Sequence, residues 1–171
     1  LLIVISVFLS TQIFSQSSAD SLKHVLSIQK GQERIPTLLI LSQQNLYVNA
    51  QHSKKYAEEA LSLSQEFGND YRKAEAYYYL GFSKFRLGDY KKALNDLNEA
   101  VTCHNKIKNY VSAAIAKNLL AIINYYIGRY EISTKLYSQN LVYYKSQNML
   151  KDYCKMLTNL ATVYSKKEDF D

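Results

Sequence analysis

The chain has 171 residues and a formal net charge of +6, from 21 Lys and Arg against 15 Asp and Glu. Five glycines and one proline are too few for the turns of a strand-rich fold, so the composition predicts an all-α protein. The cations are scattered along the sequence, a pattern typical of a solvated surface, and we therefore expect no nucleic-acid partner.

The N-terminus begins with nine apolar residues, LLIVISVFL, followed by the polar residues 10–18. Such a run is too short to span a bilayer but matches the hydrophobic region of a secretory signal. We expect residues 1–19 to be a signal peptide that is clipped at its start, with cleavage after Ser15 or Ala19. The alternative is a buried helix of the domain. The protein is therefore expected to be exported.

The rest of the chain reads as a series of helices joined by short turns. A short helix capped by Asp20 and a linker fill 20–32, and Pro36 is tolerated near the start of the next helix. Because the turns are two or three residues long, successive helices must be antiparallel neighbours. The expected helices cover residues 33–48, 53–67, 71–87, 90–107, 110–127, 130–147 and 150–167.

A repeat of 40 residues runs through this series. Gly88-Asp89-Tyr90 recurs as Gly128-Arg129-Tyr130, and Leu-Gly or Leu-Ala pairs recur at the same interval. A fixed period of this size is the signature of a stacked repeat protein. The sequence predicts an α-solenoid of antiparallel helix pairs with repeats at 33–69, 70–109, 110–149 and an incomplete 150–171. The residues that define the repeat are Leu80, Gly81, Gly88, Tyr90, Ala93, Ala100, Leu120, Ala121, Gly128, Tyr130, Leu160 and Ala161.

Each recurring position has a structural interpretation. The small residues at 81, 121 and 161 let two helix backbones approach closely, and Leu41 fills this column in the first repeat. Gly88 and Gly128 mark a tight turn inside a repeat, whereas Asn69, Asn109 and Asn148 mark a looser turn between repeats. Asp70 and Asp89 are expected to cap the helices that follow them, and Arg129 cannot cap its helix.

The last expected helix, 150–167, lacks a second helix to complete its repeat. Met156, Leu157, Leu160 and Val163 are expected to lie bare on it, and the native protein is expected to continue beyond residue 171 as a larger chain.

These residues resemble the tetratricopeptide repeat. The resemblance rests on Leu80-Gly81, the turn Gly88-Asp89-Tyr90 and the series Ala93, Leu97 and Ala100, and it extends over 33–171. The period is longer than the usual one of about 34 residues, and the proline that closes a repeat is absent. The resemblance implies a right-handed superhelix that binds a protein or peptide ligand.

The lengthened repeat also resembles a more specific group of proteins. Exported arrays of this kind look like the sensory N-terminal region of bacterial sensor histidine kinases or helix-turn-helix regulators. This likeness implies a location in the periplasm, or on a membrane and facing it. A free-standing periplasmic or surface scaffold for envelope assembly is the alternative. The oligomeric state stays open.

In the family the first helix of each pair lines the concave side, which places a candidate peptide groove on 71–87 and 110–127. Residues at helical spacing there form an aromatic stripe with a few polar groups. The alternative is that these aromatic side chains fill the core between repeats. The groove residues are Tyr78, Phe82, Phe85, Arg86, Asn118, Ile122, Tyr125 and Tyr126. The next repeat would continue the stripe with Thr158, Thr162, Ser165 and Lys166.

No arrangement of residues predicts an enzyme, a cofactor or a metal site. Cys103 and Cys154 lie on apolar stripes and are expected to be buried, with a disulfide between them left open. The histidines, His24, His52 and His104, share no spacing and are expected to be solvated or hydrogen-bonded. Glu58 and Glu59 are expected to pair with Lys54 and Lys55 one turn away.

Overall fold

The computed structural model of the chain describes residues 20–168, so the predicted signal peptide at 1–19 lies outside the described residues. Residues 20–28 are helical, and no strand occurs anywhere in 20–168. The all-α repeat fold predicted from the sequence is confirmed. The helices after residue 30 are the 3-10 helix η1 (Gly31–Glu33), α2 (Arg34–Asn45), α3 (Ala50–Glu66), α4 (Asp70–Arg86), α5 (Tyr90–Lys106), α6 (Tyr110–Tyr126), α7 (Tyr130–Ser146) and α8 (Leu150–Glu168).

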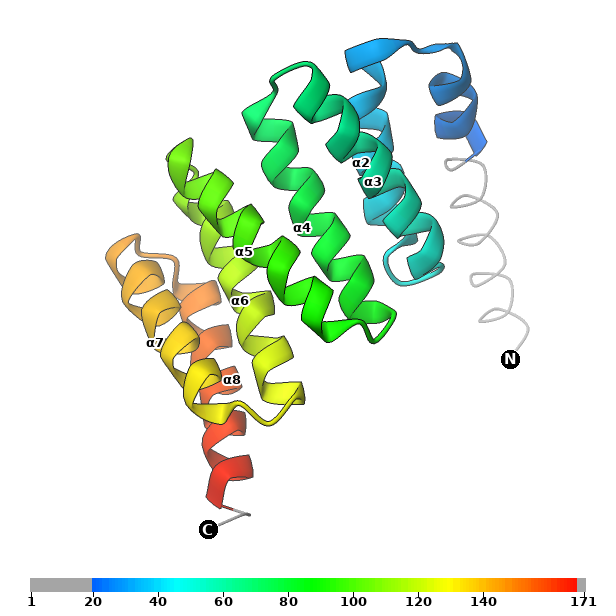
Figure 1. Cartoon of the computed structure of the whole chain (residues 1–171). Helices are drawn as coiled ribbons and strands as arrows, with labels where there is room; N and C mark the ends of the chain where they lie inside the picture. The colour runs from blue at the N-terminus through cyan, green and yellow to red at the C-terminus, as the bar shows by residue number, and fades with distance from the viewer. Residues whose placement is uncertain (1–19, 169–171) are drawn as a thin grey trace, which may run out of the picture.

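The helices follow one another as a row of antiparallel hairpins (Figure 1). Each helix packs against the helix before it and the helix after it, and α4 also contacts α2 and α6. The even-numbered helices therefore share one side of the row. Among the described residues, no helix is both long and apolar enough to cross a membrane.

The connections between α3 and α8 repeat a single turn. Each helix from α3 to α7 has 17 residues. After each one, the second linker residue adopts a positive φ: Gly68, Gly88, Lys108, Gly128 and Asn148. The following N–H donates to a carbonyl five residues back, from Asn69 to Ser64 at 2.8 Å and from Asp89 to Lys84 at 2.9 Å. This is the Schellman arrangement, which satisfies carbonyls left free at a helix end.

The tight and loose turns expected from the sequence are therefore one turn type, recurring every 20 positions from Gly68 to Gly88 and onward. Asn148 was placed in the wrong column, because its φ of 54° puts it with Gly68 and Lys108. Asn69 and Asn109 lie one position later and act as N-caps.

The helix starts follow the expected capping chemistry with one correction. Asp89 accepts from the Lys92 N–H as predicted. Asn69, not Asp70, caps α4 by accepting from the Arg72 N–H at 3.0 Å, and Asp70 is already the first helical residue. Arg129 makes no side-chain cap bond to α7 among the described residues, as its chemistry predicted.

The column of small residues lies where α4 crosses α5 and α6 crosses α7. A Cβ added to Gly81 would lie 2.7 Å from Leu97 Cγ and 3.1 Å from the Ala93 carbonyl oxygen. In the next pair the Ser133 hydroxyl donates to the Ala121 carbonyl at 2.9 Å, and Ala121 is fully buried. Small side chains are therefore required at this crossing.

The first helix pair shifts this column by one residue. Ser42, rather than Leu41, faces the second helix, since its hydroxyl donates to the Ser53 carbonyl at 2.9 Å. Asn45 donates to the Leu41 carbonyl as Asn124 donates to the Leu120 carbonyl, which fixes the same alignment. The segment from Ser42 to Ser53 is one residue shorter than the matching segment from Gly81 to Ala93. A constant interval of 40 residues therefore predicts Leu41, one residue too early, as the small-residue position of the first pair.

Helix α8 is less bare than expected. Met156 and Val163 are buried, in one cluster with Tyr137 and Tyr144. Leu160 is half-buried, and Leu157 is exposed as expected. Met156 and Val163 point to the preceding helices, so the packing of α7 and α8 covers them. Ala161 is exposed, unlike Gly81 and Ala121 in the same column.

Three smaller expectations were wrong. Cys154 is exposed and Cys103 is only half-buried, and both thiols are free. His104 is buried rather than solvated. Lys54 pairs with Glu58 as expected, but Glu59 accepts from Arg34 of α2, because the side chain points toward that helix.

Candidate functional site

An aromatic row crosses from α4 to α6. On α4, Phe82 lies between Tyr78 and Phe85, with ring centroids 6.1 and 6.3 Å away. Phe85 contacts Tyr126 of α6 at 5.7 Å, and Tyr126 contacts Tyr125 at 5.8 Å. Positions i, i+4 and i+7 share a helix face, so the sequence brings these rings together. We call these five residues the aromatic row.

The row has a buried side and an open side. Tyr78, Phe82 and Phe85 are half-buried and pack on a core cluster that includes Ala93 and Leu97. Tyr126, by contrast, exposes 63% of its surface. The sequence left open whether these aromatic residues form core or groove. In the structure the base of the row packs in the core, while its edge at Tyr126 is open to solvent.

The linker after α2 extends the row. The Tyr47 ring contacts Phe82 edge-on at 5.8 Å, and the Arg86 guanidinium lies 5.3 Å above Tyr47. Tyr47 is exposed at 70%. Sequence reasoning missed Tyr47, because it lies in a turn, where helical spacing gives no signal. Arg86 is held beside the aromatic row by this cation–π contact.

A cavity of about 260 Å³ lies at the C-terminal end of the row, between α6 and α8. Asn159 of α8 donates to the Asn118 side chain across the two helices at 3.4 Å. The predicted continuation of the groove reaches the cavity through Thr162, whereas Thr158 and Ser165 are exposed and do not line it. The lining residues are Ile122, Tyr125, Tyr126, Tyr137, Asn159, Thr162 and Val163.

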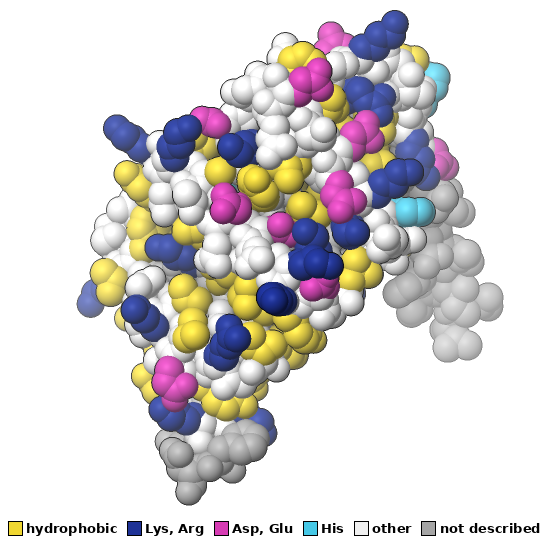
Figure 2. Space-filling model, in the orientation of Figure 1, with side chains coloured by type: hydrophobic (Ala, Val, Ile, Leu, Met, Phe, Trp, Pro, Cys, Tyr) yellow, Lys and Arg dark blue, Asp and Glu magenta, His cyan; other side chains and the backbone are white. Residues whose placement is uncertain are grey.

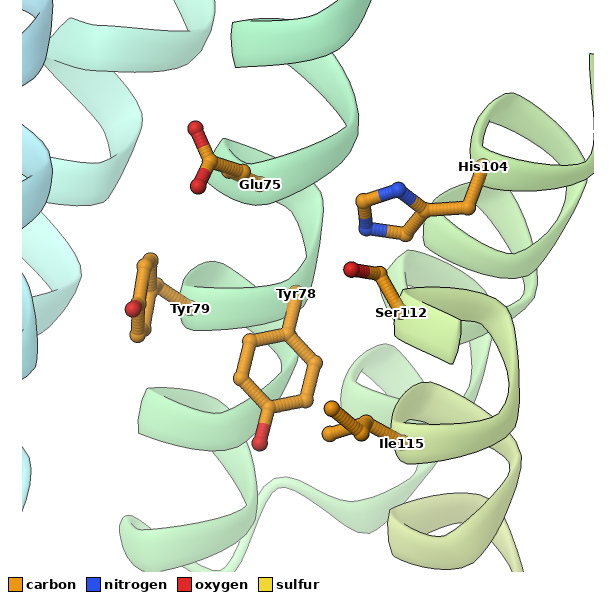
Figure 3. Close-up of a pocket in the computed structure, with 6 residues that line it drawn as sticks. All are labelled: Glu75, Tyr78, Tyr79, His104, Ser112 and Ile115. Atoms are coloured by element: carbon orange, nitrogen blue, oxygen red, sulfur yellow. The ribbon is translucent and has the colours of Figure 1, made fainter. Parts of the chain in front are cut away.

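A second cavity, of about 130 Å³, lies beside Tyr78 at the other end of the row (Figure 3). Helix α4 provides Glu75, Tyr78 and Tyr79, α5 provides His104, and α6 provides Ser112 and Ile115. Of these only Tyr78 was a predicted site residue. The others were missed because the cavity depends on how three helices meet, which no local pattern contains.

Burial controls protonation in this second cavity. His104 is 2% exposed, and desolvation lowers the pKa of its imidazole, so the ring is neutral near pH 7. Desolvation also raises the pKa of Tyr78 well above its usual range, which keeps the phenol protonated. Within residues 20–168, Nδ1 of His104 has no hydrogen-bond partner.

The charges outside these cavities do not gather into one patch. Figure 2 shows Lys and Arg side chains scattered over the visible face with Asp and Glu among them. Among the described residues, no group of three or more His, Cys, Asp or Glu could hold a metal ion.

Comparison with known proteins relates this chain to helical repeat proteins. Residues 74–105 match the family model described as tetratricopeptide repeat. No curated protein matches the sequence. Solved structures match with low identity and high structural similarity, which shows the fold alone.

A Rap protein complexed with competence and sporulation factor has a TM-score of 0.79 at 16% identity, covering 96% of this chain and 48% of that chain. Aspartyl phosphate phosphatase F from Bacillus subtilis has a TM-score of 0.79 at 14% identity, covering 95% of this chain and 42% of that chain. A signal transduction ATPase with a tetratricopeptide repeat sensor, from Pyrococcus horikoshii, has a TM-score of 0.63 at 11% identity, covering 94% and 31%.

The chain thus spans less than half the length of each of these proteins. The match at 74–105 covers α4 and most of α5, the helix pair that carries Gly81, the aromatic row and the Asp89 cap. Residues 74–105 match the tetratricopeptide repeat, and residues 20–168 have the all-α fold of a helical repeat protein.

Proposed function

We propose that this chain binds a protein or peptide ligand along the aromatic row. The observation that carries the proposal is the ring-to-ring path from Tyr47 through Phe82 and Phe85 to Tyr126, whose two ends are open to solvent. Aromatic side chains that are anchored in a core and exposed at one edge are typical of binding hot spots.

The neighbouring polar groups suit a polypeptide ligand. Arg86 of α4 offers guanidinium donors at one side of the row, and the Asn118 amide lies on α6. The cavity between α6 and α8 leaves space beside Tyr126 for an apolar side chain. The related Rap structure is a complex with competence and sporulation factor, which supports a binding role for this fold.

Substitutions at the open edge of the row test this proposal. Tyr126→Ala and Arg86→Ala remove contacts that do not support the core, so helicity should be retained. Peptides that bind the unchanged protein are first selected from a displayed library. We expect Tyr126→Ala to weaken the affinity for these peptides by roughly tenfold, the loss typical of a hot-spot aromatic residue. Tyr110→Ala is the matched control, since Tyr110 is an exposed tyrosine of the same helix outside the row. Equal binding by all three variants would overturn the proposal.

We further propose that the chain is the exported sensory or interaction region of a larger signal-transduction protein. The apolar run at residues 1–9 and the tetratricopeptide repeat sensor of the related ATPase support this context. A free-standing scaffold for envelope assembly is the alternative. The sequence encoded after residue 171 distinguishes them: a membrane-spanning run of about 20 apolar residues and an output domain support the sensor. A polar closing helix followed by a stop supports the scaffold.

A further inference from the structure

We infer that the cavity between α4 and α6 accepts a cationic side chain of the ligand, a lysine ammonium or an arginine guanidinium, with Glu75 as its counter-ion. The inference rests on the proposed function, because the cavity adjoins the aromatic row at Tyr78. It names the chemistry of the ligand: a basic peptide.

The lining of the cavity has an acidic side chain but no cationic one, although the whole chain carries +6. Glu75 is the acid among the six lining residues, and no lysine or arginine is among them. Arg72, one turn earlier, donates to Oε2 of Glu75 at 2.7 Å. A ligand cation could pair with Oε1, which accepts no hydrogen bond from within residues 20–168.

The walls of the cavity also suit a cation. The Tyr78 and Tyr79 rings meet edge-on with centroids 5.3 Å apart, and both line the cavity that Glu75 lines. Tyr79 lies on the side of Glu75, and Tyr78 points toward Ile115 (Figure 3). The negative face of an aromatic ring attracts ammonium and guanidinium groups, most strongly when they are desolvated. A carboxylate next to two such rings is a combination that selects a cation over an apolar group of the same size.

His104 lies across the cavity from Glu75 (Figure 3). Because desolvation lowers the pKa of its imidazole, the ring is neutral and adds no repulsion against a cation. A neutral imidazole has one nitrogen that accepts a hydrogen bond, and the Ser112 hydroxyl beside it can also accept. These acceptors match the several N–H donors of a lysine or arginine head group.

The size of the cavity fits one side chain. Its volume of about 130 Å³ compares with about 30 Å³ for one water molecule in the liquid. One side-chain head group can therefore enter, while the peptide backbone stays outside, along the aromatic row.

Capped amino acids test the inference without a known ligand. N-acetyl-lysine methylamide and N-acetyl-arginine methylamide should shift the His104 and Tyr78 resonances in NMR titrations and reach saturation. N-acetyl-norleucine methylamide, which lacks the charge, should not. Glu75→Gln should weaken lysine amide binding by about fivefold, the scale of a partly exposed ion pair. Glu99→Gln, an exposed acid of α5 outside the cavity, is the control and should leave binding unchanged.

Arg72→Gln should have the opposite effect to Glu75→Gln, because it removes the cation that competes for the same carboxylate. Tighter binding of lysine amide by this variant supports the inference. Unchanged or weaker binding of lysine amide by Arg72→Gln overturns the inference. The inference is also overturned if norleucine amide binds as tightly as lysine amide, or if the Glu75→Gln variant binds lysine amide as tightly as the unchanged protein. Peptides that need Tyr126 but show no preference for basic residues would overturn only the cation site and leave the proposed groove intact.

Discussion

Gly81 lies where α4 and α5 cross with no space for a side chain. Replacing it with leucine would force atoms into Leu97 Cγ and the Ala93 carbonyl, which already lie 2.7 and 3.1 Å from the position of an added Cβ. We expect Gly81→Leu to reduce the free energy of unfolding by about 1–3 kcal/mol, measured by chemical denaturation.

Ala161→Leu is the matched control for this prediction. Ala161 occupies the same column on α8 but is exposed, so a larger side chain there meets no neighbouring helix among the described residues. Its unfolding free energy should stay close to that of the parent protein. If both variants lose a similar free energy of unfolding, the close crossing of α4 and α5 is not the cause of the loss in Gly81→Leu.

At this scale the sequence predicted the residues that repeat and missed those that depend on a neighbour. Gly81 and Ala121 followed from their spacing. Ser42 was missed because one residue fewer separates the first pair of helices. His104 was missed because its burial depends on helices α4 and α6, which are distant in sequence.

At the scale of the element, the turns show how each helix ends and the next begins. Arg129 is the exception to side-chain capping between α3 and α7, since it makes no such bond within the described part of the chain. Arg129→Asp should therefore cap α7 and raise the free energy of unfolding by about 1 kcal/mol. Asp89→Ala, which removes an existing cap, should lower it by a similar amount.

Lys108 holds a backbone conformation that favours glycine. Its φ is 59°, at the turn position that Gly68, Gly88 and Gly128 occupy elsewhere. Lys108→Gly should relieve a conformational cost of about 1 kcal/mol and raise the midpoint of thermal unfolding. Gly88→Lys provides the reverse test, since nothing crowds a Cβ at Gly88 but its φ of 80° disfavours one.

The number and order of helices could be predicted because the turn residues recur so regularly. The sequence could not predict that the two expected turn types are the same turn, because Lys108 and Asn148 do not look like glycine in the sequence. Only the backbone shows that all three residue types occupy one left-handed position.

At the scale of the whole molecule, the predicted groove residues lie on α4 and α6. Helical spacing predicted which residues of each helix share a face, and the resemblance to the repeat family predicted which helices to choose. The cavities that border the aromatic row were beyond prediction. Each needs residues from three helices, as with Tyr137 of α7 beside Tyr126 and Asn159. A repeat sequence thus predicts which face is aromatic, while the stacking of the helices decides where that face is hollow.

Buried tyrosines make the free energy of unfolding depend on pH in the alkaline range. Tyr137 and Tyr144 are each 3% exposed, and desolvation raises the pKa of each to about 12 from an ordinary value of 10.0. A raised pKa favours the protonated phenol in the folded state. The resulting stabilisation is complete below about pH 10 and is lost as the pH rises toward about 12.

We therefore expect the free energy of unfolding to fall by a few kcal/mol between about pH 8 and about pH 11, measured by urea denaturation. The double variant Tyr137→Phe, Tyr144→Phe has no phenols at these positions to ionise. Its stability should fall less over the same range, although other groups titrate equally in both proteins. If the two proteins lose the same free energy, the buried phenols do not cause the alkaline transition, and the packing of α7 against α6 and α8 must admit water to these rings.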